Sequence, residues 1–530
     1  MGRSSLIRLM QRFRDTSRAE AGPILTARRA LLPAVGLVFV AICLPVVLQG
    51  APLADDFRNC LGPESAGLGP HLASSANRLG AIRPARFLEI ILTSAVCRRL
   101  PFGVAIAVPL VLAIAVALLL RRLLTELGAP SPWPDVGGAT WLLQPMGTEA
   151  ALWPAALHIN LGLCLALIAL LLHRRGRHAL ASVAGLGACL SVEQVILALP
   201  LAVWLTSPPE RRRYAVTTTV AIIAAALCAF VLFPGSNPRL AVPLSERLTG
   251  LVAEPAFYAE FPAVGLGVHS IPLAVLWAFP LSLLILVGSA ALGWRFVPSL
   301  LGRALPSGAN RGSATATSAL LLSLIVLVNL PVLLTVPHQG SPRVFTPTWL
   351  VLAAAVGAVG WRLPLSANRT TGAIAGVFLA GACLSLAFSV SVRLQSADFT
   401  VASSRQLAES VEDGDVVAVC DIRRTVVEPA PRGSFAIHEL VYRFSASDAL
   451  SFYTGDRARF RLGGELWDKG RCPNLRGADF VTSFDDLLRA WRSTPPSSAG
   501  RGASSLSFAG SRYGRCRAAP TQSLRPRSCS

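Results

Sequence analysis

The chain has 530 residues, of which 53% are hydrophobic and only 15% are charged, and its mean hydropathy is +0.54. Soluble domains carry about 25% charged residues, so the composition argues against an ordinary soluble protein. The net charge of +20 alone would suggest an acidic partner such as nucleic acid. The arginines, however, cluster in short loops between apolar runs, which is typical of membrane topology. We therefore predict a mainly α, polytopic membrane protein that binds no nucleic acid.

The acidic residues divide the chain into parts. Of the 29 Asp and Glu, 14 precede Arg393 and the other 15 lie between Asp398 and Asp486. This distribution favours a membrane body followed by a polar domain and a disordered tail rich in Ser, Gly, Pro and Arg. The predicted parts are a basic cytoplasmic segment, a transmembrane domain with a long outer loop at 51–101, a small α/β extracytoplasmic domain and the tail, over residues 1–30, 31–393, 394–493 and 494–530.

Eleven apolar runs are candidate transmembrane helices, and the first is long enough to be a retained span of about 20 residues. With the N-terminus in the cytoplasm, the arginine-bearing loops fall on the cytoplasmic side and the C-terminal domain lies outside a multi-pass cell membrane protein. Two of the runs, 136–147 and 179–191, are too short to span alone, and each could be a tilted or re-entrant element. The runs are 30–49, 102–120, 136–147, 153–172, 179–191, 194–206, 215–233, 270–293, 317–336, 345–361 and 372–391.

This topology places five ionisable residues at the outer face: Asp55, Asp56, Glu149, Glu193 and Arg343. Ionisable groups at the edge of a membrane domain are candidates for function. We expect the five to converge on one outward-facing cavity.

The polar C-terminal part reads as a small α/β domain. A short helix, a turn at Asp413–Gly414 and a buried strand are expected first, then a strand, a helix and a strand over 438–462. The segment 479–491, "DFVTSFDDLLRAW", is expected to form a closing helix. Its acids, including Asp485 and Asp486, are expected to form a solvated surface.

The 11 cysteines lack the spacing of a zinc site. Those inside apolar runs are expected to be packing residues. Cys60 with Cys97, and Cys420 with Cys472, lie on the predicted oxidising side, so each pair is a hypothesis for a disulfide.

Four motifs in chain order resemble the polytopic membrane glycosyltransferases of the C superfamily, which include the protein O-mannosyltransferases and the aminoarabinose transferase of lipid A. The motifs cover an acidic pair in the first outer loop, a loop helix with an Arg-Pro signature, a membrane-edge Pro with Glu and Trp, and an outer edge that enters a late span. They read "LADDFRN", "RLGAIRPARFLEIIL", "QPMGTEAALWPAALHINLGL" and "SPRVFTPTWLVLA". The resemblance covers about Leu31 to Ser391. It departs from the family at His158, where relatives often carry Arg, and at Val344 and Thr346, which replace aromatic residues.

The resemblance implies an inverting enzyme whose donor is a sugar on a polyprenyl phosphate. The acceptor would be an envelope glycan, lipid or protein on the outer face. By resemblance, Asp55 or Asp56 is the general base that takes the acceptor proton. Neighbouring side chains of an extended segment point to opposite sides. We therefore favour Asp55 as the base, with Asp56 binding acceptor, metal or loop backbone.

The leaving phosphate requires a cation, and the fork of Arg matches phosphate oxygens. Arg343 with nearby His338 is the first candidate, and Arg83 and Arg86 on the loop helix are the second. Glu149, Glu193 and His158 are assigned to the substrate cavity. The metal requirement and the oligomeric state stay open. Some family members use a divalent cation, and no other cofactor is predicted. The other partners are membrane lipids and the lipid-linked donor.

Each residue also has a structural alternative. The acidic pair could be a solvated turn that caps the next segment, and Arg343 could be a snorkelling anchor. Glu149 and Glu193 could be interfacial residues or charges favoured at a helix N-terminus. His158 could be a hydrogen-bonded core residue. Arg83 and Arg86 could contact lipid headgroups.

Three other functions are open. The first is an envelope-polysaccharide polymerase or ligase that uses a diphosphate-linked oligosaccharide and relies more on outer-loop Arg and His. The second is a transporter or flippase, which would favour inverted repeats and charges near the midplane. The third is a catalytically inactive scaffold of the same fold.

Overall fold

A computed structural model of the chain describes its central helices and much of its C-terminal part. The described residues are 31–52, 55–79, 84–143, 147–232, 346–359 and 411–422, with shorter stretches inside 323–330, 383–410, 425–438, 450–464 and 472–489. The predicted N-terminal segment and tail, and most of the runs at 270–293, 317–336 and 372–391, lie outside them.

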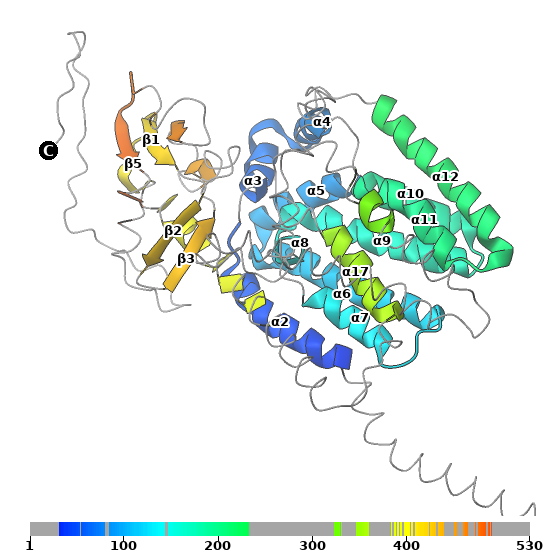
Figure 1. Ribbon diagram of the computed structural model, residues 1–530. Coiled ribbons are helices and arrows are strands. Elements are labelled where there is room, and N and C mark those ends of the chain that lie inside the picture. The colour runs from blue at the N-terminus through cyan, green and yellow to red at the C-terminus, as the bar shows by residue number, and fades with distance from the viewer. Residues whose placement is uncertain are drawn as a thin grey trace, which may run out of the picture.

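The described part is mainly helical and has a small sheet at its C-terminal end (Figure 1). Its helices are α2 (Leu31–Gln49), α3 (Asp55–Ala66), α4 (Leu68–Leu79), α5 (Pro84–Arg99), α6 (Gly103–Glu126), α7 (Trp133–Leu142), α8 (Gly147–Leu152), η1 (Pro154–Ala156), α9 (Leu157–Arg174), α10 (His178–Ser191), α11 (Gln194–Thr206), α12 (Pro209–Leu232) and α17 (Thr346–Val359).

Three helical stretches in the described part are long and apolar enough to cross a membrane: α2, α6 and η1–α9. At 1.5 Å per residue, the 24 residues of α6 extend about 36 Å. This supports a membrane protein, whereas the predicted total of eleven crossings is not tested by the described residues. The shorter apolar helices α10, α11 and α17 lie where spans were predicted.

Two predicted boundaries are wrong. The run 102–120 was expected to end before the arginines, but α6 continues through Arg121 and Arg122 to Glu126. Arg and Leu are good helix formers, and Arg122 Nε lies 2.8 Å from Glu126 Oε1 at the favourable i,i+4 spacing. The run 136–147 is also not one element. It forms the ten-residue α7, and a separate helix, α8, begins at Gly147.

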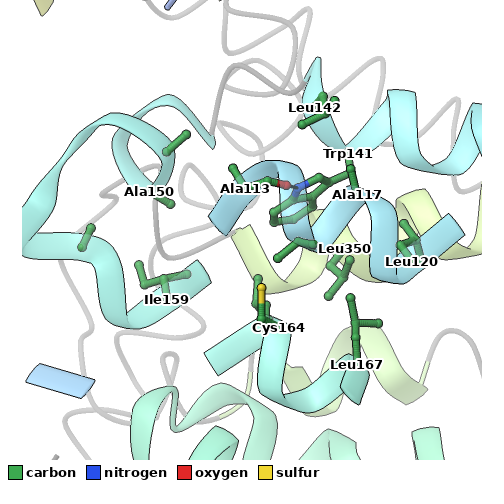
Figure 2. Close-up of a cluster of buried hydrophobic side chains, with 14 of the residues drawn as sticks. Ala113, Ala117, Leu120, Trp141, Leu142, Ala150, Ile159, Cys164, Leu167 and Leu350 are labelled. Carbon is green, nitrogen blue, oxygen red and sulfur yellow. Dashed lines mark hydrogen bonds between the residues drawn. The ribbon is translucent and has the colours of Figure 1, made fainter. Parts of the chain in front are cut away.

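The core of the helical body lies where α6, α7, α9 and α17 meet (Figure 2). Trp141 is 2% exposed, and its Nε1 donates a hydrogen bond of 2.8 Å to the carbonyl of Ala113. A buried indole needs such a partner for its N–H. The bond therefore fixes α7 against α6.

Glycines allow α7 and α17 to approach closely. A Cβ atom added to Gly357 would lie 3.2 Å from the Cα of Gly137 and 2.4 Å from Cδ1 of Leu124. Any larger side chain at Gly357 would therefore force these helices apart.

The C-terminal part contains a three-stranded parallel sheet with order β4-β1-β5 and a two-stranded antiparallel hairpin, β2-β3. The strands are β1 (Val416–Ile422), β2 (Thr425–Ala430), β3 (Gly433–His438), β4 (Arg459–Gly464) and β5 (Phe480–Ser483). The helix, turn and buried strand predicted at the start of this domain are confirmed, since helical residues reach Ser410 and β1 follows the turn at Asp413–Gly414. The second disulfide hypothesis is also borne out, because Cys420 and Cys472 are bonded with a Cα–Cα distance of 4.4 Å.

The predicted closing helix over 479–491 is wrong in its first half. Phe480–Ser483 pairs with β1 as a parallel strand, because this segment is rich in residues that favour strands. Helical residues follow Ser483, whose hydroxyl donates to Asp486 Oδ2 at 2.7 Å while the Asp486 amide donates back to it at 3.1 Å. Asp486 therefore pairs with Ser483 at the start of a helix.

Candidate functional site

Three helices, α3, α4 and α5, lie in the described residues of the predicted outer loop 51–101. A disulfide between Cys60 and Cys97, with a Cα–Cα distance of 5.8 Å, joins α3 to α5 and bears out the first disulfide hypothesis. The candidate site is therefore built on helices that are covalently linked.

Asp56 lies in the first turn of α3 and is fully buried. Its Oδ1 accepts a hydrogen bond of 3.0 Å from the backbone amide of Ala155 in η1. Asp56 thus binds backbone outside the loop, whereas the expected backbone partner was the loop itself, and the burial of its side chain excludes a solvated turn at this residue. The side chain of Asp55 lies outside the described atoms.

A second buried carboxylate belongs to Glu89 on α5. It accepts a hydrogen bond from Arg86, one turn earlier on the same helix, and its Oε2 lies 3.0 Å from Nδ1 of His158 near the start of α9. A carboxylate at one ring nitrogen orients an imidazole and selects its tautomer. Glu89 thus fixes His158.

Arg86 links the carboxylates of Glu89 and Asp56, because it binds Glu89 directly and shares Ala155 with Asp56. Its Nη1 donates to the carbonyl oxygen of Ala155 at 2.9 Å, while Asp56 binds the amide of Ala155. The carboxylate of Asp56 and the guanidinium of Arg86 therefore bind the amide and the carbonyl of the same residue, Ala155. We call Asp56, Arg86, Glu89 and His158 the outer-loop cluster. Its two carboxylates, one arginine and one histidine could accept a proton and bind an anion.

His71 on α4 adds another titratable group beside this cluster. The side chain is buried, and its ring packs so closely on Gly62 that a Cβ atom there would lie 2.2 Å from it. Burial, with the charges of Arg58 and Arg86, lowers the pKa of His71 below 6.5. Asn59 on α3 is 1% exposed, and its Nδ2 has no hydrogen-bond partner among the described residues.

The polar C-terminal part lies against the same region, and Figure 1 shows its strands on the side of α3 away from α12. The rings of Phe57 and Phe452 meet edge to face at 5.5 Å. Arg393 Nη2 donates to the carbonyl of Leu152 at 2.7 Å, and Gln49 donates to the carbonyl of Leu394 at 3.1 Å. The residue next to Asp56 is therefore in contact with the C-terminal part.

Of the predicted site residues, the structure brings together Asp56, Arg86 and His158. Glu193 is the half-buried N-cap residue of α11, and Glu149 lies on α8 with a side chain outside the described atoms. Arg83, His338 and Arg343 are also outside the description, whereas Thr346 is buried at the start of α17.

Sequence reasoning missed Glu89, His71 and Asn59. Glu89 could have been found, because an acid inside the apolar stretch "FLEIIL" and three residues after an arginine is a signal for a buried ion pair.

In the part of the chain that the structure describes, no group of three or more His, Cys, Asp or Glu is arranged to hold a metal ion. No protein-family model matches the chain, and no curated protein matches it. The candidate site is therefore interpreted from its own residues.

Proposed function

We propose that the protein is an integral membrane glycosyltransferase that moves a sugar from a polyprenyl-phosphate donor to an envelope glycan, lipid or protein. The observation that carries this proposal is the outer-loop cluster. It draws three of the motif regions with the family resemblance into one buried network, through Asp56, through Arg86 and Glu89, and through His158.

In the proposed reaction, an acceptor hydroxyl attacks the anomeric carbon while a carboxylate takes its proton. The bond from this carbon to the phosphate oxygen breaks, and the polyprenyl phosphate leaves as an anion. Asp55 is the proposed base, because Asp56 is occupied by the amide of Ala155. Arg86 is a candidate for attracting the leaving phosphate, since Arg binds phosphate oxygens well.

The proposed topology places the cluster outside the cell and the N-terminus in the cytoplasm, with eleven crossings in total. Two observations support it. His158 and Arg174 lie near opposite ends of the 18-residue helix α9, so the cluster and the arginine-rich turns are at opposite ends of the bundle. The disulfide Cys60–Cys97 is at the cluster end, and disulfides persist in oxidising compartments.

The test is a mass comparison of envelope glycans, lipids and glycoproteins from a strain that lacks the gene. The strain is complemented with wild type, Asp55→Asn, Asp56→Asn or Glu89→Gln, and membrane expression of each variant is measured. The control is Glu210→Gln, because Glu210 is an exposed acid at the other end of the bundle. Wild type and the control should restore one sugar increment, and Asp55→Asn should not. If Asp55→Asn restores it fully, Asp55 is not the base.

A polymerase or ligase that uses a diphosphate-linked donor is the second candidate. It is favoured by one observation, which is that Arg86 and His158 belong to the cluster. The purified protein would be given a polyprenyl-phosphate monosaccharide or a diphosphate-linked oligosaccharide in parallel. Transfer from the first donor alone supports the proposed function, and transfer from the second alone supports the ligase.

A further inference from the structure

Two turns at the end of the bundle opposite the outer-loop cluster are held together by arginines. Arg174, the last residue of α9, donates from Nη1 to the carbonyl of Thr206, the last residue of α11, at 2.8 Å. Arg211, in the first turn of α12, donates back to the carbonyl of Arg174 at 3.3 Å. Gly176 has a positive φ of 78°, and a Cβ atom there would lie 2.7 Å from Nη1 of Arg211. The α9–α10 and α11–α12 turns therefore form one surface.

The arginines on this surface fall into two groups. Arg122 and Arg175 bind the carboxylate of Glu126, and Arg121 binds Asp135. In contrast, five arginines form no ion pair with a described carboxylate. Arg174 donates to the backbone carbonyls of Thr206 and Glu126, and we call the other four the arginine rim: Arg177, Arg211, Arg212 and Arg213. Four guanidinium groups without an ion pair lie on adjoining turns, beside the exposed carboxylate of Glu210, and together they leave a net positive field that attracts an anion.

Arg212 carries the most specific geometry. Its guanidinium carbon lies 4.9 Å from the ring centroid of Trp204, near the end of α11. Its Nε is buried and has no hydrogen-bond partner among the described residues. The stacking orients the guanidinium, and the group retains the capacity to donate hydrogen bonds to an anion.

The same surface has an amphipathic border. Trp204 is 43% exposed and Tyr214 is 60% exposed. The ring of Tyr214 packs edge to face on His178 at 4.7 Å, and Leu180 and Val183 on α10 are 57% and 72% exposed. Exposed Trp and Tyr beside apolar helix surface are typical of residues at the headgroup level of a bilayer. A soluble phosphate would make no use of this border, whereas a phospholipid would.

We propose that the arginine rim binds the phosphate of an anionic phospholipid headgroup. Arg212 on Trp204 is its specific contact, and Arg177, Arg211 and Arg213 supply the surrounding charge. The acyl chains lie beside the exposed apolar side chains of α10. This binding site does not depend on the proposed glycosyl transfer.

The experiment measures thermal unfolding of the purified full chain in neutral detergent, with added phosphatidylglycerol, phosphatidylcholine or inorganic phosphate. Phosphatidylglycerol should raise the unfolding temperature of wild type saturably, and the other two should leave it unchanged. Arg212→Gln should weaken the apparent affinity about fivefold, and Arg212→Gln with Arg213→Gln about 25-fold, which corresponds to about 1 kcal/mol per arginine.

The matched control is Arg122→Gln, at an arginine that is engaged in an ion pair with Glu126. It should change the affinity less than twofold. Arg213→Gln alone changes only an exposed side chain, so it tests the proposal if the double variant does not fold. If phosphatidylglycerol stabilised wild type, Arg212→Gln and the double variant equally, the specific site would be overturned in favour of diffuse surface charge. Stabilisation by inorganic phosphate to the same extent would overturn the lipid as its ligand.

Discussion

Nδ1 of His158 lies 3.0 Å from Oε2 of Glu89, although the two residues are 69 positions apart in the chain. Glu89 has no exposed side-chain surface, whereas His158 is 20% exposed. His158 is thus the more exposed member of the pair, and the buried carboxylate of Glu89 orients its ring. The contact also ties α5 to the start of α9, which is part of a stretch long and apolar enough to cross a membrane.

Removal of the Glu89 carboxylate should destabilise the protein. A buried ion pair that loses one partner costs about 3–5 kcal/mol, because the remaining charge has no compensation. Glu89→Ala should therefore lower the unfolding temperature of the purified protein clearly, and Glu89→Gln should do so less. Glu210→Gln should change stability by no more than about 0.5 kcal/mol.

The coupling to His158 can be measured separately. In a double-mutant cycle that combines Glu89→Ala with His158→Ala, the two substitutions should show an interaction free energy of about 0.5–3 kcal/mol. Strictly additive effects would mean that the contact contributes nothing.

The Cys60–Cys97 disulfide should stabilise the loop helices. It closes a segment of 37 residues, and loss of such a bond typically costs about 2–4 kcal/mol. Cys60→Ser with Cys97→Ser should therefore lower the unfolding temperature, whereas Cys228→Ser, at an exposed free cysteine, should not. Thiol labelling before and after reduction gives the check by mass. Labelling of Cys60 without reductant would rule out the bond.

The stability of the segment that contains α4 should depend on pH through His71. Its pKa is lowered below 6.5 in the folded chain by burial and by Arg58 and Arg86. Below about pH 6.5 the unfolded chain therefore binds a proton that the folded chain does not. The contribution of His71 to the free energy of unfolding is complete above this pH. It is lost as the pH falls, by at most about 1.4 kcal/mol per pH unit.

His71→Gln provides the matched comparison, because glutamine does not titrate. Unfolding temperatures of both proteins would be measured between pH 5.5 and 7.5. As the pH falls, the unfolding temperature of wild type should decrease relative to that of His71→Gln. A constant difference over this range would show that His71 does not titrate in the folding equilibrium.

Enlarging Gly357 should disturb the contact between α7 and α17. The added atoms of Gly357→Val would overlap Leu124 and the backbone of Gly137, and overpacking of this kind costs about 1–3 kcal/mol. Gly36→Ala on α2 is the control, since nothing lies within 4 Å of the added Cβ. It should be neutral or slightly stabilising, because Ala favours helices. Unfolding temperatures of the two variants decide the point.

Local signals explain which expectations succeeded. The apolar runs 179–191 and 194–206 have polar or Pro-containing boundaries, and the structure has α10 and α11 at these places. The apolar run 102–120 stops at the first arginine, whereas α6 continues beyond it to Glu126, because Arg and Leu are both good helix formers. Phe480–Ser483 was misassigned because its parallel pairing with β1 depends on contacts more than 60 residues away.

The site was predictable only as a region. The motifs indicated that the first outer loop and the start of α9 matter together, and Asp56, Arg86 and His158 do meet there. The role of Glu89 depends on which face of α5 is buried, and the hydrogen bond from Ala155 depends on backbone geometry. Neither is encoded in short-range spacing.

The two hydrogen bonds at Ala155 have a mechanical consequence. Its amide is held by Asp56 and its carbonyl by Arg86, directly before α9 begins at Leu157. The backbone that leads into α9 is thus anchored at this end, and the other end of the helix, at Arg174, is hydrogen-bonded to α11. The 18 residues of α9 place these two anchored ends about 27 Å apart, so the helix is fixed at both ends by side-chain contacts.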